Sequence, residues 1–312
     1  MSYAFDPEIQ PWVSMIPQLD ISDLDSARAT VKTMAAAGPP FMLPAGLGRE
    51  ELSVPGLDSD PDIPVLVFAP IDGRETNRPA MVYLHGGGFV LGDAAGDQTV
   101  PAEIALAAGA VVVSVDYRIA PEHPFPAALH DGFAVLKWLA ANAADLQVDP
   151  TRIAIGGVSA GAGIAAGVAL FARDQGGPQI CFQMLDIPEL DDTLSTQSMQ
   201  QFTDTPLWNL PNGVVSWKSY LGGQEASPYA APARSSDLAG LPPAYVSVCE
   251  FDPLRDEGIN YAQRLMQAGV PTELHSFPGT FHGSGGAVPM AAVSQRMRTE
   301  LWKRPAADSA PR

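Results

Sequence analysis

Residues 152–161 read Arg-Ile-Ala-Ile-Gly-Gly-Val-Ser-Ala-Gly, and this segment is the strongest indication of the fold class. An apolar run at 153–155 leads into the pattern Gly-x-Ser-x-Gly, and a segment of small helix-forming residues follows at 160–173. A strand, a strained turn and a helix in this order lift the serine out of a sheet, and only small neighbours let the two backbones come so close. The hydroxyl of Ser159 then stands at a helix N-terminus, where free N–H groups favour developing negative charge. The pattern therefore predicts that Ser159 is a nucleophile.

A second glycine-rich segment follows an apolar run at 80–84 and reads His85-Gly86-Gly87-Gly88-Phe89. Consecutive glycines can turn their N–H groups toward one point, as an oxyanion hole requires. A phosphate-binding loop would need a following Lys-Ser/Thr or the spacing Gly-x-Gly-x-x-Gly, and this segment has neither. We expect one oxyanion donor from Ala160 and the other from Gly87, with Gly86 or Gly88 beside it.

Short apolar runs alternate with helical stretches from about residue 63 onward. Strands that alternate with helices predict an α/β fold with a mostly parallel central sheet and helices on both faces. The run at 110–115 is continuously apolar and rich in β-branched residues, which is typical of a strand buried on both faces. The expected strands are 63–68, 80–84, 110–115, 153–155, 180–185, 244–249 and 273–277, and the expected helices are 127–146, 160–173, 254–267 and 287–302.

Two stretches, about 1–50 and 186–230, interrupt this alternation and carry many prolines and aromatic residues. A segment inserted after a core strand of such a sheet lies over the carboxyl ends of the strands, where ligands bind. We therefore expect a single domain over 1–312 with a helical cap formed by these two stretches. Among their aromatic residues, Trp12, Phe202 and Trp208 are expected to narrow the pocket beneath the cap. The alternative for each of them is ordinary packing against the sheet.

The order of catalytic groups in this type of fold is nucleophile, acid, histidine, and it selects the base. Of the five histidines only His275 and His282 follow Ser159. His275 lies in an alternating strand pattern and is expected to be a structural polar residue. His282 lies in a loop beyond the last expected strand, where functional residues gather, so His282 is the expected base.

The acid is expected directly after the strand at 244–249. Asp252 stands there and is favoured over Glu250 and Asp256, of which Asp256 could instead stabilise the start of the following helix. In this role Asp252 would hold one tautomer of the histidine and stabilise its charged form.

The charge balance limits the partners of the chain. Its 312 residues include 35 acidic and 18 basic side chains, which gives a formal net charge of −17. Such a chain repels phosphate backbones, and no local basic cluster opposes this field, so we expect no nucleic-acid partner. The apolar runs are all shorter than the roughly 18 residues that a membrane span needs, and we expect no membrane partner.

The location is inferred from the first residues and the cysteines. The start of the chain lacks a basic region followed by an apolar one, so a signal peptide is not expected. Cys181 and Cys249 lie in apolar strand-like runs and are expected to be buried free thiols of a reducing compartment. A cytoplasmic location is the expectation.

Taken together, these motifs resemble the hormone-sensitive-lipase family of α/β-hydrolase esterases, from the N-terminal segment to the final histidine. A looser match, in residues 186–192 and 205–208, resembles the bacterial heroin-esterase type of acetyl esterase. One position departs from the family pattern: Val158 stands before the nucleophile, where an acidic residue is usual. The matching residues are His85-Gly86-Gly87-Gly88-Phe89, Asp116-Tyr117-Arg118-Ile119-Ala120-Pro121-Glu122-His123-Pro124-Phe125-Pro126-Ala127, Gly157-Val158-Ser159-Ala160-Gly161, Asp252-Pro253-Leu254-Arg255-Asp256-Glu257-Gly258 and Phe281-His282-Gly283.

The resemblance implies a serine carboxylesterase that hydrolyses short-chain acyl esters through an acyl-enzyme intermediate, with a small-molecule ester as its partner. It also implies that no cofactor and no metal takes part. The oligomeric state is left open between a monomer and a homo-oligomer. The alternatives are a lipase for longer chains and a ligand-binding α/β-hydrolase without catalysis, and the presence of Ser159, Asp252 and His282 together argues against the second.

Overall fold

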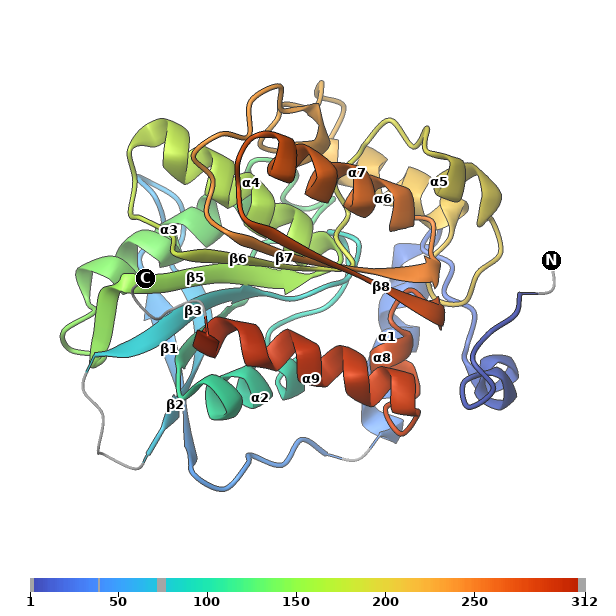
Figure 1. Cartoon of the computed structure of the whole chain (residues 1–312), viewed down its shortest axis with the longest axis horizontal. Coiled ribbons are helices and arrows are strands. Elements are labelled where there is room, and N and C mark those ends of the chain that lie inside the picture. Colours follow the sequence, from blue (N-terminus) through green and yellow to red (C-terminus); the bar gives the residue numbers. More distant parts are fainter. Residues whose placement is uncertain (1–2, 39, 72–76, 308–312) are drawn as a thin grey trace.

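A central sheet of eight strands organises the protein, which the computed structural model describes at residues 3–38, 40–71 and 77–307 (Figure 1). The strand order within these residues is β1-β2-β4-β3-β5-β6-β7-β8. β2 pairs antiparallel with β1 and with β4, and the other neighbours are parallel, so the sheet is mostly parallel, as the sequence predicts. The strands are β1 (Leu47–Val54), β2 (Ile63–Pro70), β3 (Arg78–Leu84), β4 (Val111–Val115), β5 (Val148–Val158), β6 (Phe182–Asp186), β7 (Ala244–Phe251) and β8 (Thr272–Phe281).

Helices cover both faces of the sheet (Figure 1). On one face lie α3 (Ala127–Ala141), α4 (Ala160–Gln175) and α7 (Arg255–Gln267), and on the other lie α2 (Thr99–Ala108) and α9 (Ala292–Ala307). The remaining helical elements are η1 (Gln10–Met15), α1 (Leu24–Ala37), α5 (Gln197–Gln201), α6 (Leu210–Leu221), η2 (Pro232–Arg234) and α8 (Ser284–Ala287).

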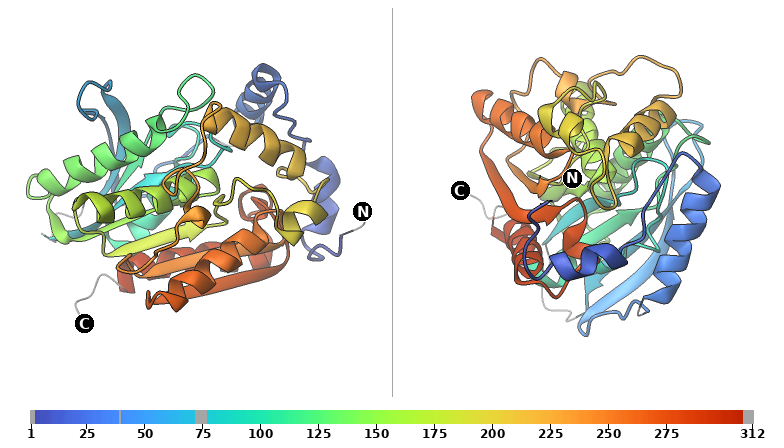
Figure 2. Two further views of the ribbon diagram at one scale, coloured as in Figure 1. Left: turned by 90° about the horizontal axis from the view of Figure 1, so that it is seen from above. Right: turned by 90° about the vertical axis from the view of Figure 1, so that its right-hand side faces the viewer.

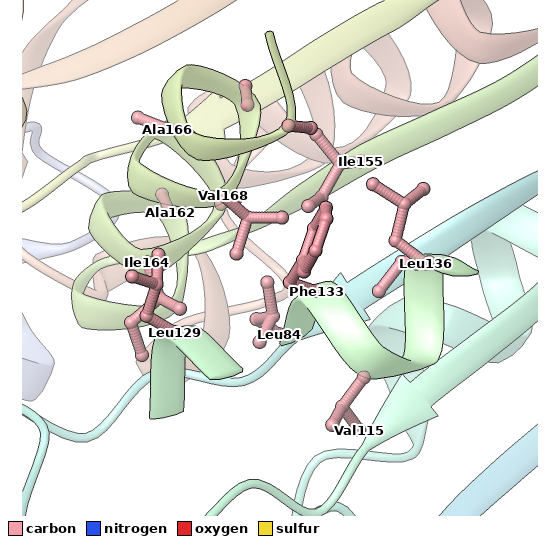
Figure 3. Packing of buried hydrophobic residues seen from close by; sticks show 14 of the residues in the cluster. Leu84, Val115, Leu129, Phe133, Leu136, Ile155, Ala162, Ile164, Ala166 and Val168 are labelled. Atoms are coloured by element: carbon pink, nitrogen blue, oxygen red, sulfur yellow. The ribbon is translucent and has the colours of Figure 1, made fainter. Parts of the chain in front are cut away.

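The alternation of side chains along the strands gives each face its own apolar layer. In β3, Val82 and Leu84 belong to the cluster that packs against α3 and α4, whereas Met81 and Tyr83 belong to the cluster on the side of α2 and α9. Figure 3 shows the first layer, in which Leu84 lies among side chains of α3 and α4. In β3 and β4 every residue is buried and nearly all are apolar, which is the pattern from which the sequence predicts these central strands.

Several boundaries differ from the sequence expectation. The helix expected at 127–146 ends at Ala141, because the side-chain amide of Asn142 donates to the carbonyl of Trp138 and closes the last turn. The helix expected at 287–302 is divided into α8 and α9. Pro289 stands between the two, and a residue before proline is disfavoured in helical conformation. β1 and α2 are not among the expected elements.

The two stretches that interrupt the alternation meet at the carboxyl end of the parallel strands, as the end view in Figure 2 shows. The side-chain amide of Asn212 donates to the carbonyl of Leu19 at 2.8 Å and accepts the N–H of Ile21 at 3.3 Å. Ile21 and Trp208 share a buried cluster. The expected boundary at about residue 50 is wrong, because residues 47–50 belong to β1 and pair with β2 in the sheet.

Candidate active site

Ser159 occupies the turn between β5 and α4 in a conformation that side chains rarely adopt, with φ 57° and ψ −123°. The turn is crowded: a Cβ on Gly161 would lie 2.2 Å from the carbonyl oxygens of both Leu84 and His85. Only glycine therefore lets the start of α4 lie against the end of β3. The sharp turn leaves the serine hydroxyl at the N-terminus of the 16-residue helix α4.

The backbone of Ser159 is held by the segment that follows β6. Its N–H donates to the carbonyl of Asp186 at 2.8 Å, and its carbonyl accepts the N–H of Glu189 at 3.2 Å. These two hydrogen bonds oppose relaxation of the strained turn, since a residue in a sparsely populated region persists only where its surroundings fix it.

His282 follows β8 directly and reaches the serine. Its Nε2 lies 2.8 Å from the Oγ of Ser159, and its Nδ1 lies 2.8 Å from the Oδ2 of Asp252. The other carboxylate oxygen of Asp252 accepts the N–H of Leu254 at 2.8 Å. Asp252 is 1% exposed, and Ser159 and His282 are each 6% exposed. The carboxylate can only accept from Nδ1, so Nε2 is left free to accept the proton of the serine hydroxyl.

The rival residues lie elsewhere. His275 contacts Glu273 and Glu300 and packs on Tyr245, which is a structural environment in keeping with the sequence interpretation. A carboxylate oxygen of Glu250 accepts the N–H of Gly279 at 2.7 Å. The carboxylate of Asp256 accepts the N–H of Ser198 at 2.8 Å. None of the three contacts Ser159 or His282 in the described part of the chain.

The three glycines after His85 form a tight loop beside Ser159. Gly87 has φ 134°, and a Cβ there would lie 2.0 Å from the carbonyl oxygen of Leu91, so no other residue fits. A Cβ on Gly86 would lie 3.5 Å from the Cβ of Ser159, which places the loop next to the nucleophile. The N–H groups of Gly87, Gly88 and Ala160 donate to no acceptor within the residues that the structure describes. Gly88 and Ala160 are buried and Gly87 is half-buried, and unpaired N–H groups in a protein interior are rare and require an explanation, such as a ligand.

Comparison with known proteins identifies the family. The sequence profile described as "alpha/beta hydrolase fold" matches residues 81–285. This chain belongs to that α/β-hydrolase family. A carboxylesterase of Mycobacterium tuberculosis is 41% identical over 292 residues, which cover 89% of each protein. The solved structure of a bacterial heroin esterase has a TM-score of 0.94 at 46% identity and covers 99% of each chain. An esterase from Mycobacterium marinum, LipW, has a TM-score of 0.89 at 37% identity and covers 99% of this chain and 97% of its own.

These relatives confirm the resemblance and the fold that the sequence predicts, and this α/β-hydrolase is a carboxylic ester hydrolase of the hormone-sensitive-lipase type.

The three aromatic residues singled out in the sequence have different surroundings in the α/β-hydrolase. Trp208 is buried, its ring lies 6.0 Å from the ring of His282, and a Cβ on Gly88 would lie 2.2 Å from its Cη2. The expectation for Phe202 is wrong, because its ring packs on those of Tyr3 and Phe251 and on the guanidinium of Arg255. Trp12 is 41% exposed and borders an apolar cavity of about 500 Å³. Met15, Ile16, Pro17, Met34, Leu207, Gly283, Gly286 and Ala287 complete its lining.

Val158, the departure from the family pattern, is partly buried at the end of β5. A Cβ on Gly86 would lie 3.2 Å from its Cγ1, so the valine presents an apolar methyl to the start of the glycine loop. The α/β-hydrolase therefore has no polar side chain at this position that could bond to the loop.

Two further residues border the site, and the sequence pattern gave neither a role. The hydroxyl of Ser216 on α6 lies 3.0 Å from the carbonyl oxygen of Gly88 and 2.9 Å from Oε1 of Glu189. Glu189 is fully buried, and this burial raises the pKa of its carboxyl to about 8. Glu189 is part of the stretch 186–192 that carries the looser resemblance, which is the only signal in the sequence that could have drawn attention to it. Ser216 is a polar residue in a helix and carries no such signal.

The described residues hold no group of three or more His, Cys, Asp or Glu side chains that could bind a metal ion. Among the same residues, none of the helices has the length and apolar character of a membrane span. Neither cysteine forms a disulfide bond, as expected, but the expectation that both are buried is wrong for Cys181, which is partly exposed. Cys249 is buried, and this burial raises the pKa of its thiol well above the usual range.

Proposed function

We propose that this α/β-hydrolase is a serine esterase for short-chain acyl esters and that Ser159, His282 and Asp252 are its catalytic triad. The observation that carries the proposal is the unbroken line of two hydrogen bonds, each 2.8 Å long, from Ser159 through His282 to Asp252. The strained turn at the nucleophile and the glycine loop beside it support the same assignment. Strained backbone conformations cost free energy, and they cluster at active sites.

In the reaction, His282 takes the proton of Ser159 as the serine oxygen attacks the ester carbonyl carbon. Asp252 keeps the proton on Nδ1 of the histidine and stabilises the imidazolium that forms. The histidine then gives its proton to the leaving alcohol, and the acyl group stays on the serine. Water, activated by the same histidine, releases the carboxylic acid and restores the hydroxyl.

The negative oxygen of each tetrahedral intermediate would accept hydrogen bonds from the N–H groups of Ala160 and Gly87. Gly88 or Gly86 would be the neighbouring donor. Removing one such donor costs roughly 3–4 kcal/mol of transition-state stabilisation. The helix dipole of α4 adds to this at the position of Ala160.

We assign the role of a cap to residues 3–38 and 186–230. Their mutual contacts through Asn212 and the position of Trp208 against both Gly88 and His282 support this role. A buried indole at this place restricts the room for an acyl chain, and we therefore propose acetyl to butyryl esters as the preferred substrates. The cavity beside Trp12 adjoins His282 through Gly283 and suits the alcohol group, to which the histidine delivers its proton.

The proposal includes a small-molecule ester as partner and a reducing compartment, the cytoplasm, as location. Two cysteines outside any disulfide bond support the compartment, since oxidising compartments favour disulfide-bonded cysteines. The net charge of −17 disfavours nucleic acid as a partner.

The test is covalent labelling combined with substitution. We expect an organophosphate to modify Ser159 alone and Ser159→Ala to abolish hydrolysis of nitrophenyl acetate while circular dichroism stays unchanged. Label recovered by mass spectrometry on Ser195 or Ser284, or activity retained by the variant, would refute the assignment. A series of nitrophenyl esters from acetyl to octanoyl tests the chain length, and a rate that still rises at octanoyl would favour a lipase instead.

A further inference from the structure

A fully buried carboxyl, that of Glu189, reaches the glycine loop through a single hydroxyl. Glu189 follows β6, and Ser216 lies in the middle of α6. The Oγ of Ser216 is 3.0 Å from the carbonyl oxygen of Gly88 and 2.9 Å from Oε1 of Glu189, and neither side chain is exposed. Both distances are within the range of ordinary hydrogen bonds between oxygen atoms.

The number of available hydrogens fixes the protonation state of these three oxygen-bearing groups. A serine hydroxyl has one hydrogen to donate, and the carbonyl of Gly88 has none. Both contacts can be hydrogen bonds only if the carboxyl of Glu189 supplies the second hydrogen. We propose that Glu189 is protonated in the resting enzyme and donates to Ser216, whose own hydrogen is thereby committed to the carbonyl of Gly88.

The surroundings of Glu189 agree with a neutral acid. Its second oxygen, Oε2, has no hydrogen-bond partner in the described part of the chain, and a carboxylate anion without donors is costly to bury. The titratable groups that face it are Asp252, Glu257 on α7, Tyr117 and Tyr220, and none of these carries a positive charge. Burial is the main cause that raises the pKa of Glu189 to about 8; the contact with Ser216 opposes this rise, and the negative charge of Asp252 adds to it.

The consequence for the site concerns the loop, so Glu189 is a positioning residue. While Glu189 is protonated, the hydroxyl of Ser216 fixes the carbonyl of Gly88 and with it the orientation of the peptides at the proposed oxyanion hole. Once Glu189 ionises, the carboxylate competes for the hydrogen of Ser216, and the carbonyl of Gly88 loses the hydrogen bond that holds the loop. This consequence rests on the proposed function, whereas the protonation state itself does not.

The first test measures kcat and KM against pH. For the wild type we expect kcat to fall above about pH 8. In Glu189→Gln the amide can donate to Ser216 at every pH, so kcat should stay near the wild-type value at neutral pH and no longer fall. Ser216→Ala should lower kcat about tenfold with little change in KM, less than the loss of a whole oxyanion donor. The matched controls, Glu103→Gln and Ser114→Ala on elements away from Gly88, should keep the wild-type profile.

The second test does not use catalysis. Infrared difference spectroscopy should show the carbonyl stretch of a protonated carboxyl at neutral pH, which disappears as the pH is raised and is missing from Glu189→Gln. If that variant does not fold, Ser216→Ala should shift the same band, because the carboxyl loses its hydrogen-bond partner. A carboxylate signal in place of this band, or an alkaline fall of kcat that persists in Glu189→Gln, would overturn the proposal. An active Ser159→Ala would overturn the proposed function and leave the infrared result standing.

Discussion

Asp252→Asn tests the chemistry of the site most sharply, because the structure fixes which way the new amide must face. One oxygen of Asp252 accepts the N–H of Leu254 and the other accepts from Nδ1 of His282, each at 2.8 Å. An amide nitrogen cannot face the N–H of Leu254, so the amide oxygen must stay there and the NH₂ group must face the histidine. Nδ1 then becomes an acceptor, and the proton moves to Nε2, which faces Ser159. The histidine can no longer take the serine proton.

The expected loss follows from this reversed tautomer. Replacing the acid of such a triad by its amide lowers kcat by about 10⁴-fold. At 1.36 kcal/mol for each factor of ten, this is about 5 kcal/mol of transition-state stabilisation. We expect KM for nitrophenyl acetate to change little, since the amide has the shape of the carboxylate and leaves the binding surfaces intact.

The assay is steady-state hydrolysis of nitrophenyl acetate near neutral pH, with thermal unfolding as the check on folding. His275→Ala is the matched control and should retain more than half of the wild-type kcat, because His275 lies away from Ser159. A folded Asp252→Asn variant that keeps a tenth or more of the wild-type kcat would refute the reasoning and direct attention to Glu250 or Asp256.

Four further outcomes are expected. Trp208→Ala should move the optimum of kcat/KM toward longer acyl chains, each added CH₂ gaining about 0.8 kcal/mol, and should lower Tm because the ring is buried; a lower Tm with the same optimum would make the ring plain core. The pKa of Glu189 is raised in the folded state, so its contribution to stability is full below about pH 4.5 and is lost as the pH rises through about 8; Tm should fall less over this range in Glu189→Gln, and parallel curves would contradict this. Asp131→Asn should cost about 3 kcal/mol of unfolding free energy, because the buried carboxylate pairs with Arg118, whereas Asp60→Asn on the more exposed side of the same arginine should cost less; equal losses would rule out burial as the cause. Exhaustive chelation should leave kcat unchanged, and a loss restored by a divalent ion would speak against serine chemistry.

The residues of the proposed triad could be selected from the sequence because of how a parallel sheet is built. Ser159 follows β5, Asp252 follows β7 and His282 follows β8, and the carboxyl ends of parallel strands meet at one edge. Residues far apart in the chain therefore gather if each comes directly after a strand. The fold could be predicted for the related reason that strands buried on both faces are almost entirely apolar, as in β3 and β4.

The missed elements lack that signal. β1 lies at the edge of the sheet and exposes Arg49, Glu50 and Glu51, so its sequence reads as a polar loop. α2 contains Pro101, and almost all of its residues are apolar. The alternation of apolar and polar residues by which a helix is recognised is therefore absent from its sequence. The contact between Glu189 and Ser216 joins an irregular segment to a helix. No regular sequence spacing connects the two residues, so their contact could not be predicted from the sequence.

The N-terminal segment borders the cavity that we propose for the alcohol group, and this position affects how the enzyme can be attached to a support. Tyr3 packs on Phe202 and Phe251 at the carboxyl end of the strands, and Trp12 borders the cavity next to Gly283. α9 runs away from this end, so the last turn of α9 and the N-terminal segment lie on different sides of the molecule (Figure 1). A tether joined ahead of Tyr3 would crowd the entrance and slow the arrival of esters. A tether joined after α9 would hold the enzyme with its entrance turned toward the solution.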